Sequence, residues 1–391
     1  MKRLDIILLS TTLILITAGL LAIFSAAGIH YFLRQLFFLP VGIGGFLFAT
    51  LIPRRLIYGI ADFLYGISLI LLVLVLIIGT GPGARRWFAF GSITLQPSEF
   101  AKLTTVIILA KYLGYRRKMD FNFKTLAAPS IIVLPVVLLI LVEPDLSTAL
   151  TFLPMYAAML YWQGLRPLHI LLLFMPLLAF IAGFSIYFWI PFFIIFSTIV
   201  FIRMRFSHAL LAIGISSFLG LISPVILSNL KEYQKARIMS FFAPWLDPHG
   251  LGWNIIQSQI AIGSGRIIGK GYLHGTQKRL GFLPNRHTDF IFSCIAEEFG
   301  FIGCMLLLAI LNLLIYRILV TAYKSRDQNG ALMCIGFAAI ICYQAFVNIG
   351  MLLGLLPVTG ITLPFLSYGG SSLLVSLIMI GFTHNVATRS E

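Results

Sequence analysis

The chain has 391 residues, of which 59% are hydrophobic and 10% are charged. Soluble globular domains carry about 25% charged residues, so this composition excludes a soluble protein and indicates a polytopic membrane protein. The formal net charge of +15 could suit nucleic acid. No Lys- and Arg-rich run provides a soluble basic face, however, and we expect no nucleic-acid partner. The positive charge is better explained by basic cytoplasmic loops or by an anionic ligand.

The chain begins with a basic tripeptide and an apolar run that ends near Ser25-Ala26-Ala27, a pattern that resembles a secretory signal peptide. The run is about 20 residues long, which is enough to span a bilayer and long for a signal-peptide core. We therefore predict an uncleaved first helix.

Long apolar runs without strict alternation predict an all-α polytopic membrane protein rather than a barrel. Hydropathy predicts about twelve transmembrane helices, at residues 5–25, 33–51, 56–79, 97–113, 127–143, 146–163, 168–188, 190–203, 207–228, 290–317, 330–354 and 371–386. The eighth is short and could be re-entrant. The alternative is ten spans, with residues 190–228 packed in another way.

The basic residues of the short loops set the orientation, because they favour the cytoplasmic side. With both termini inside, nearly every predicted inner loop is basic. The predicted outer segments are residues 79–98, 143–145, 228–288 and 357–372. The third is the longest and is also basic, which suggests an anionic partner such as a phosphate-bearing lipid head group. The alternative is that a long loop is translocated across the membrane regardless of its charge.

Asp289 follows a polar cluster, residues 285–288, and precedes the apolar run that starts at residue 290. It therefore stands where a membrane helix begins, at the edge of water. An ionisable side chain there is a functional candidate, because burying an unpaired charge is costly. The alternative is a carboxylate that only stabilises the start of the helix.

A glycine-rich turn, residues 79–84, leads into Arg85, Arg86 and Trp87. Backbone amides and guanidinium groups together suit phosphate oxygens. The alternative is an interfacial Trp flanked by arginines that extend toward water.

Glu99 and Lys102 enter the fourth predicted span on one helical face, three residues apart, where they can pair. Charges in a membrane are costly unless they face a polar cavity, and we favour a functional cavity. Glu143 and Asp145 flank a proline at the predicted outer boundary. Asp145 can cap the sixth span, and Lys102 is a reasonable partner for this pair of carboxylates.

A second glycine-rich segment, residues 262–279, carries Lys270 and Lys278. Its glycines permit close approach of the backbone to a ligand. Prolines and glycines at residues 357–372 indicate irregular backbone, which is tolerated at membrane depth only where it lines a cavity or is buried in protein. We interpret this segment as a cavity wall.

Glu297 and Glu298 lie two turns deeper on the Asp289 helix, and we interpret them mainly as structural. Lys102 and the polar groups of Gln344 and Asn348 are their candidate partners. The four cysteines, which all fall inside apolar runs, are predicted to be small buried hydrophobic residues: Cys294, Cys304, Cys334 and Cys342.

Taken together, the motifs resemble the SEDS family of polytopic peptidoglycan glycosyltransferases, the group that contains RodA and FtsW. The segments that carry the resemblance are GPGARRW, QPSEFAK, EPDLSTA, the stretch from QSQIAIGSG to AEEFG, and PVTGITLPFLSYGGSS. The segment GTQKRLGFLPNRHTDFIF is more similar to the RodA (elongation) branch than to the FtsW (division) branch. The chain departs from the family at Glu143, where members usually have Gln, at Asn285, where they usually have Glu, and at Arg266, where they usually have Gly.

The resemblance implies a single SEDS domain over residues 1–391, in which residues 190–228 add a helical pair to a ten-span core. Residues 229–289 would form a large extracytoplasmic catalytic loop. The enzyme would polymerise lipid II on the outer face of the bacterial cytoplasmic membrane during cell elongation and shape maintenance. Its partners would be lipid II, undecaprenyl-diphosphate-linked glycan, membrane lipids and a class B penicillin-binding protein.

Asp289 matches the family's catalytic aspartate and would act as general base on the 4-hydroxyl group of the incoming lipid II sugar. Cations would stabilise the leaving diphosphate. The substrate-binding candidates are Arg85, Arg86, Glu99, Lys102, Asp145, Lys270, Lys278, His287 and Ser367. No cofactor is predicted and no Cys and His spacing supports a zinc site; a divalent cation at the lipid diphosphate is left open. The rival functions are a flippase for the lipid-linked precursor and a non-catalytic scaffold for the penicillin-binding protein.

Overall fold

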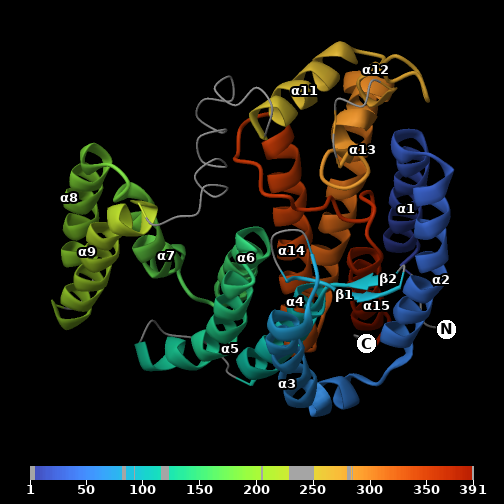
Figure 1. Cartoon of the computed structure of the whole chain (residues 1–391). Coiled ribbons are helices and arrows are strands. Elements are labelled where there is room, and N and C mark those ends of the chain that lie inside the picture. Colours follow the sequence, from blue (N-terminus) through green and yellow to red (C-terminus); the bar gives the residue numbers. More distant parts are fainter. Residues whose placement is uncertain are drawn as a thin grey trace.

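The computed structural model describes residues 5–81, 85–91, 93–115, 123–203, 206–228, 251–279, 283 and 285–389, which form mainly long helices (Figure 1). The helices of the first half are α1 (Ile6–Ala27), α2 (Ile29–Leu51), α3 (Arg54–Ile78), α4 (Pro97–Gly114), α5 (Phe123–Val142), α6 (Leu146–Trp162) and α7 (Pro167–Ala182). Those of the second half are α8 (Ile186–Arg203), α9 (Phe206–Ser228), α11 (Leu251–Ser264), α12 (Thr276–Arg279), α13 (Ile291–Lys324), α14 (Gln328–Leu352) and α15 (Gly370–Arg389).

Every predicted membrane span coincides with one of these helices. Among the described helices, seven are long and apolar enough to cross a membrane: α1, α2, α3, α5, α13, α14 and α15. Two others, α6 and α7, have only 17 and 16 residues, and α4 carries three charged side chains. A polytopic helical membrane protein is therefore confirmed, whereas the choice between ten and twelve spans stays a prediction.

A small β-hairpin interrupts the otherwise helical fold. Strands β1 (Phe88–Phe90) and β2 (Ile93–Leu95) pair antiparallel between α3 and α4, with Phe88 opposite Leu95. The hairpin was not predicted, and the all-α class of the fold is otherwise confirmed. Each strand has only three residues, too short a segment for hydropathy to reveal.

Two ion pairs join segments that are far apart in the sequence and were predicted to lie on the same side of the membrane. Arg54 Nη1 lies 2.8 Å from Asp327 Oδ2, and Arg317 Nη2 lies 2.7 Å from Asp5 Oδ2. All four residues belong to segments predicted to share the cytoplasmic side. The pairs therefore support the prediction that these segments lie on the same side of the membrane.

The core is built around α14, which packs against α13, α6, α4 and α15 and is buried along most of its length. By contrast, α7, α8 and α9 pack mainly on one another around a small apolar cluster of their own: Leu172, Met175, Phe196, Val200 and Ala209. In Figure 1 these three helices stand apart from the rest of the bundle, and α7 follows directly after α6. The prediction that residues 190–228 are a helical pair added to a ten-span core stays a prediction.

The backbone of α13 departs from helical geometry at Gly300, whose φ is +64°. The segment after α11 fills the resulting gap in the helical hydrogen bonds. The amide of Phe301 donates to Arg266 O at 2.9 Å, and the amide of Lys270 donates to Glu297 O at 3.0 Å. A Cβ atom at Gly300 would lie 2.3 Å from Gly269 N, so this close approach requires glycine. The irregular helix and the loop therefore form one unit.

None of the four cysteines forms a disulfide in the described part of the chain. Cys294, Cys304 and Cys334 are buried as predicted, whereas Cys342 is exposed. Cys342 lies on the narrow outer stripe of α14 that also contains the exposed Phe346, and an apolar run does not tell which of its residues face outward.

Candidate active site

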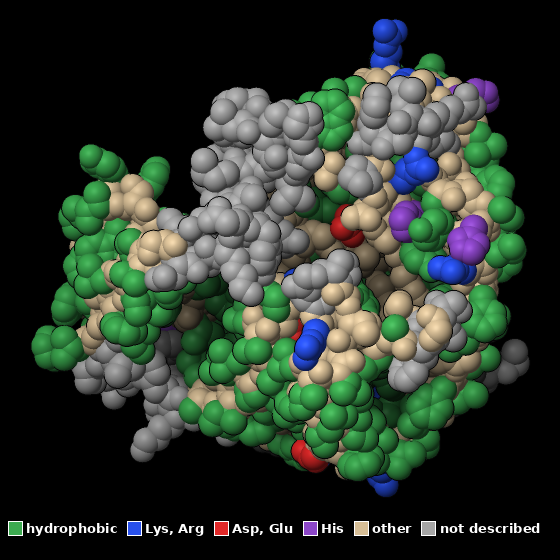
Figure 2. Space-filling view, viewed as in Figure 1, with side chains coloured by type: hydrophobic (Ala, Val, Ile, Leu, Met, Phe, Trp, Pro, Cys, Tyr) green, Lys and Arg blue, Asp and Glu red, His purple; other side chains and the backbone are tan. Residues whose placement is uncertain are grey.

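A cavity of about 410 Å³ lies at the end of the bundle where α4, α6, α14 and α15 meet the β-hairpin and the turn before α13. Its walls are mostly polar, and they bring together residues from across the chain: Arg86, Trp87, Thr94, Gln96, Glu99, Asp145, Thr148, Thr151, Asn285, Thr288, Asp289, Gln344, Thr359, Gly360, Ile361, Thr362, Tyr368, Gly369, Gly370, Ser371 and Ser372. Figure 2 shows several acidic, basic and histidine side chains around a hollow on this face, in contrast to the hydrophobic surface beside it. The prediction that residues 357–372 form a cavity wall is confirmed.

The Asp289 carboxylate reaches this cavity from the turn that precedes α13, as predicted. Asn348 Nδ2 fixes the backbone of the turn by donating to Asp289 O at 2.9 Å and to Ile361 O at 2.7 Å. Asn348 is completely buried. The turn and the irregular 357–372 segment are thus held together by one amide from α14.

His287 and Ser367 hold the same turn from its other side and do not line the cavity. Ser367 Oγ donates to Thr288 O at 2.7 Å, and the Tyr368 amide donates to His287 O at 2.8 Å. The His287 ring packs against Tyr31, with ring centroids 4.1 Å apart, and against Tyr368. Burial and the neighbouring Arg286 lower the pKa of His287. These residues therefore position Asp289 indirectly.

Arg86 is the cation that the structure places on the cavity wall. Its Nε donates to Glu143 O at 3.1 Å and its Nη2 donates to Pro144 O. The guanidinium group is thus anchored to the turn between α5 and α6 through backbone carbonyls. These contacts use only two of its five N–H groups.

Arg85 does not line the cavity, so of the two predicted arginines the structure brings only Arg86 to its wall, and a substrate-binding role of Arg85 stays a prediction. Its Nη1 donates to Leu76 O at 3.2 Å and to Ile77 O at 2.9 Å. These are carbonyls of the last turn of α3, where a cation is favourable. Adjacent residues in an extended segment point to opposite sides, which separates the two arginines.

Glu99 and Lys102 form the predicted ion pair, with Nζ 2.8 Å from Oε1. Lys102 is only 1% exposed and Glu99 borders the cavity. Lys102 therefore does not pair with the carboxylates of residues 143–145, nor with Glu297 or Glu298 as considered above. The partner one turn away on α4 is the nearer one.

Asp145 caps α6 as predicted and also lines the cavity. Its Oδ1 accepts from the Thr148 amide at 3.2 Å and its Oδ2 accepts from Thr148 Oγ1 at 2.9 Å and from Gln96 Nε2 at 3.3 Å. Glu143 differs sharply, because among the described residues neither of its buried carboxylate oxygens has a hydrogen-bond partner. Burial first, and then the charge of Asp145, raise the pKa of Glu143 to about 8, and Arg86 opposes this shift.

Lys270 lies away from the cavity and pairs with Glu297, its Nζ 2.7 Å from Oε1. The fully buried Glu297 carboxylate also accepts from the amide of Thr276 at 2.7 Å and from that of Gln277 at 3.2 Å. Glu298 accepts from Ser25 Oγ at 2.6 Å. The structural interpretation of the two glutamates is confirmed, with different partners from those predicted. The side chain of Lys278 lies outside the described residues.

Four further residues of the cavity lining were not predicted individually from the sequence. Trp87, Gln96, Thr148 and Tyr368 are neutral side chains, and only the density of polar groups in otherwise apolar segments could have indicated them. Tyr368 and Gln96 stand inside segments that were singled out for other residues.

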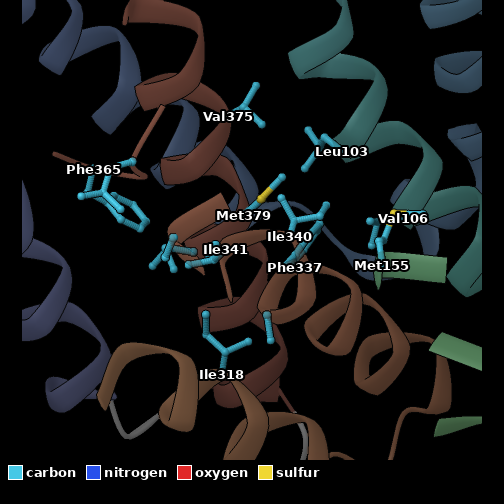
Figure 3. Close-up of a cluster of buried hydrophobic side chains, with 14 of the residues drawn as sticks. Leu103, Val106, Met155, Ile318, Phe337, Ile340, Ile341, Phe365, Val375 and Met379 are labelled. Atoms are coloured by element: carbon cyan, nitrogen blue, oxygen red, sulfur yellow. The ribbon is translucent and has the colours of Figure 1, made fainter. Parts of the chain in front are cut away.

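Beneath the cavity, each helix that contributes to its walls also carries buried apolar side chains, although α4 and α15 keep the buried polar residues Lys102, Thr105 and Ser376 at a similar depth. One or two turns deeper than the polar lining residues, α4 carries Leu103 and Val106, and α6 carries Met155. At the corresponding depth, α14 carries the buried apolar residues Phe337, Ile340 and Ile341, and α15 carries Val375 and Met379. These side chains converge in one buried cluster (Figure 3). Among the described residues, the polar lining therefore ends within the outer part of the bundle.

The family model for FtsW, RodA and SpoVE, described as "Cell cycle protein", matches residues 4–192 and 187–391. Stage V sporulation protein E of Bacillus subtilis (strain 168) is 34% identical, over 99% of this chain and 98% of its own. The peptidoglycan glycosyltransferase MrdB of Escherichia coli (strain K12) is 34% identical, over 100% and 95%. The probable peptidoglycan glycosyltransferase FtsW of Geobacter metallireducens is 33% identical, over 100% and 96%.

Solved structures agree over the whole length of the chain. A chain from "Structural coordination of polymerization and crosslinking by a peptidoglycan synthase complex" is 31% identical with a TM-score of 0.77, over 99% of this chain and 98% of its own. The rod shape determining protein RodA of Thermus thermophilus is 28% identical with a TM-score of 0.66, over 99% and 98%. Both the sequence match and the shared architecture extend from end to end, and the chain therefore belongs to the FtsW, RodA and SpoVE family, also known as SEDS proteins.

Proposed function

We propose that this protein is a peptidoglycan glycosyltransferase that polymerises lipid II, with its active site in the cavity around Asp289. The observation that carries the proposal is that Asp289 and Arg86, a carboxylate and a cation 203 positions apart (289 − 86), line the same polar cavity. The names of relatives in the same family support the class of reaction.

The proposed reaction joins two lipid-linked sugars. Asp289 accepts the proton of the 4-hydroxyl group of the incoming lipid II, and the oxygen attacks the anomeric carbon of the growing strand. The bond from that carbon to the undecaprenyl diphosphate breaks, and the diphosphate leaves with the electron pair. Arg86, held on the cavity wall, stabilises the negative charge that develops on the diphosphate.

The cavity is proposed to open to the extracytoplasmic side. Its walls belong to the outer ends of α4, α6, α14 and α15 in the predicted orientation. The ion-paired loops at the opposite ends include Arg54, Asp327, Asp5 and Arg317. Because basic loops favour the cytoplasm, this arrangement supports a bacterial cytoplasmic membrane protein whose active site faces outward.

Replacement of Asp289 by Asn tests the general base. Polymerisation of purified lipid II should fall by about 10²- to 10⁴-fold, because the amide cannot accept the proton. The matched control is Asp62→Asn, which removes an exposed carboxylate on α3 that pairs with Lys111 far from the cavity lining. Polymer formed by Asp289→Asn at the control's rate, with equal membrane insertion, would refute the assignment.

We propose further that the protein acts in cell elongation together with a class B penicillin-binding protein. The RodA-like segment from Gly275 to Phe292 supports the elongation role, and similarity to a chain from a peptidoglycan synthase complex supports the partnership. Expression in cells depleted of their elongation enzyme should restore rod shape, whereas rescue of division in cells depleted of the division enzyme would contradict this role. Gel analysis of lipid II products, with and without the partner, would measure whether the partner is required.

The rival function, a flippase, needs a polar path through both halves of the membrane. The buried apolar side chains beneath the cavity on α4, α6, α14 and α15 favour an enzyme over a transporter. Transfer of labelled lipid II across liposomes without any polymer product would favour the flippase. Polymer formed by the isolated protein would exclude a scaffold without activity.

A further inference from the structure

Glu143 is a buried carboxyl group to which the reaction proposed above assigns no role. The residue is 1% exposed, and neither carboxylate oxygen has a hydrogen-bond partner among the described residues. It lies in the turn between α5 and α6, outside both helices. An ionised carboxylate without donors is costly to bury, so this environment favours the protonated form.

The turn that contains Glu143 is also the anchor of Arg86. The guanidinium group donates to the backbone carbonyls of Glu143 and Pro144, and its remaining N–H groups are available toward the cavity. The carboxyl group and the guanidinium group are thus attached to the same short segment. Protonated, the carboxyl group exerts no charge on Arg86; ionised, it would compete with the cavity for that cation.

The neighbouring Asp145 has the opposite environment. It accepts hydrogen bonds from Thr148 and Gln96, whereas the Glu143 carboxyl group accepts none among the described residues. Its negative charge disfavours a second ionised carboxylate two residues away. The charged groups that act on Glu143 are therefore Asp145 from the start of α6 and Arg86 from the segment after α3.

We propose that Glu143 is a positioning residue that leaves Arg86 directed into the cavity for as long as its carboxyl group is protonated, and that withdraws Arg86 when it ionises. The inference rests on the proposed function, in which Arg86 stabilises the leaving diphosphate. The raised pKa of Glu143, about 8, places the change on the alkaline side of neutrality.

Infrared difference spectroscopy of the full chain in lipid nanodiscs, without substrate, tests the protonation. The carbonyl band of a protonated carboxylic acid should be present at neutral pH and should disappear with a midpoint near 8. The band should be missing in Glu143→Gln and retained in Asp62→Asn. An identical spectrum for Glu143→Gln and the wild type at neutral pH would show that Glu143 is already ionised and would overturn the proposal.

The pH profile of lipid II polymerisation tests the consequence for Arg86. The wild-type rate should fall above the pKa of about 8, by about tenfold for each pH unit. Glu143→Gln should remain active through this range, and Asp62→Asn should follow the wild type. A second neutral variant, Glu143→Met, keeps the test available if the Gln variant does not fold. An alkaline fall with the same midpoint in the neutral variants would overturn the proposal. Because the infrared measurement needs no substrate, failure of the proposed glycosyltransferase function would be recognised separately.

Discussion

Arg85 and Arg86 are adjacent in the chain and have different surroundings in the structure. Arg86 lines the cavity, whereas Arg85 caps the carbonyls at the end of α3. We expect Arg86→Gln to lower the rate of lipid II polymerisation by about tenfold or more, because a donor to the leaving diphosphate is lost. Arg85→Gln is the matched control and should stay within about twofold of the wild type. Equal losses in both variants would contradict a specific role for Arg86.

The Glu99–Lys102 pair allows a prediction of stability. Because Lys102 is nearly fully buried, Lys102→Met leaves the Glu99 carboxylate without its cation. Breaking a buried pair in this way costs about 3–5 kcal/mol. The double variant Glu99→Gln with Lys102→Met should recover part of that loss. Unfolding in detergent, followed by circular dichroism, measures both changes, and equal stability of the single and double variants would contradict the coupling.

At the scale of elements, the packing of α13 against the segment after α11 depends on Gly300. Gly300→Ala places a Cβ atom 2.3 Å from Gly269 N at a backbone φ of +64°. We expect this loop to detach and to become sensitive to proteolysis, with a fall in activity because α13 also carries the Asp289 turn. Gly263→Ala is the control, since a Cβ atom there meets no other atom within 4 Å. Protection of the loop in Gly300→Ala equal to that in the control would show that the irregular backbone is not required.

Most helices could be predicted from the sequence because each of them is a long apolar run, and seven of the described helices are long enough to cross a bilayer. Even the local pair of Glu99 and Lys102 could be predicted, since spacing along one helix determines the contact. The partners of Glu297 and Glu298 could not, because Lys270 and Ser25 approach them only when separate elements pack. The choice of which arginine faces the cavity, and the lack of a hydrogen-bond partner for the Glu143 carboxyl group among the described residues, likewise depend on how separate elements pack.

For the molecule as a whole, the orientation in the membrane is the main prediction. In a cysteine-free background, Ala89→Cys in β1 should react with an impermeant thiol reagent added outside the cell, and Arg326→Cys should not. Both positions are exposed at opposite ends of the bundle in the predicted orientation. The reverse pattern of labelling would place the cavity in the cytoplasm and would exclude access to an outward-facing lipid II pool.

The apolar residues beneath the cavity have a consequence for energetics. In the proposed reaction, buried apolar side chains such as Leu103, Phe337 and Met379 lie beneath the cavity, so the proton that Asp289 accepts from the sugar hydroxyl would return to the extracytoplasmic water through the opening by which the sugars enter. Strand synthesis would then neither draw on the proton-motive force nor dissipate it. The energy of each addition would come entirely from breaking the bond that joins the growing strand to its undecaprenyl diphosphate.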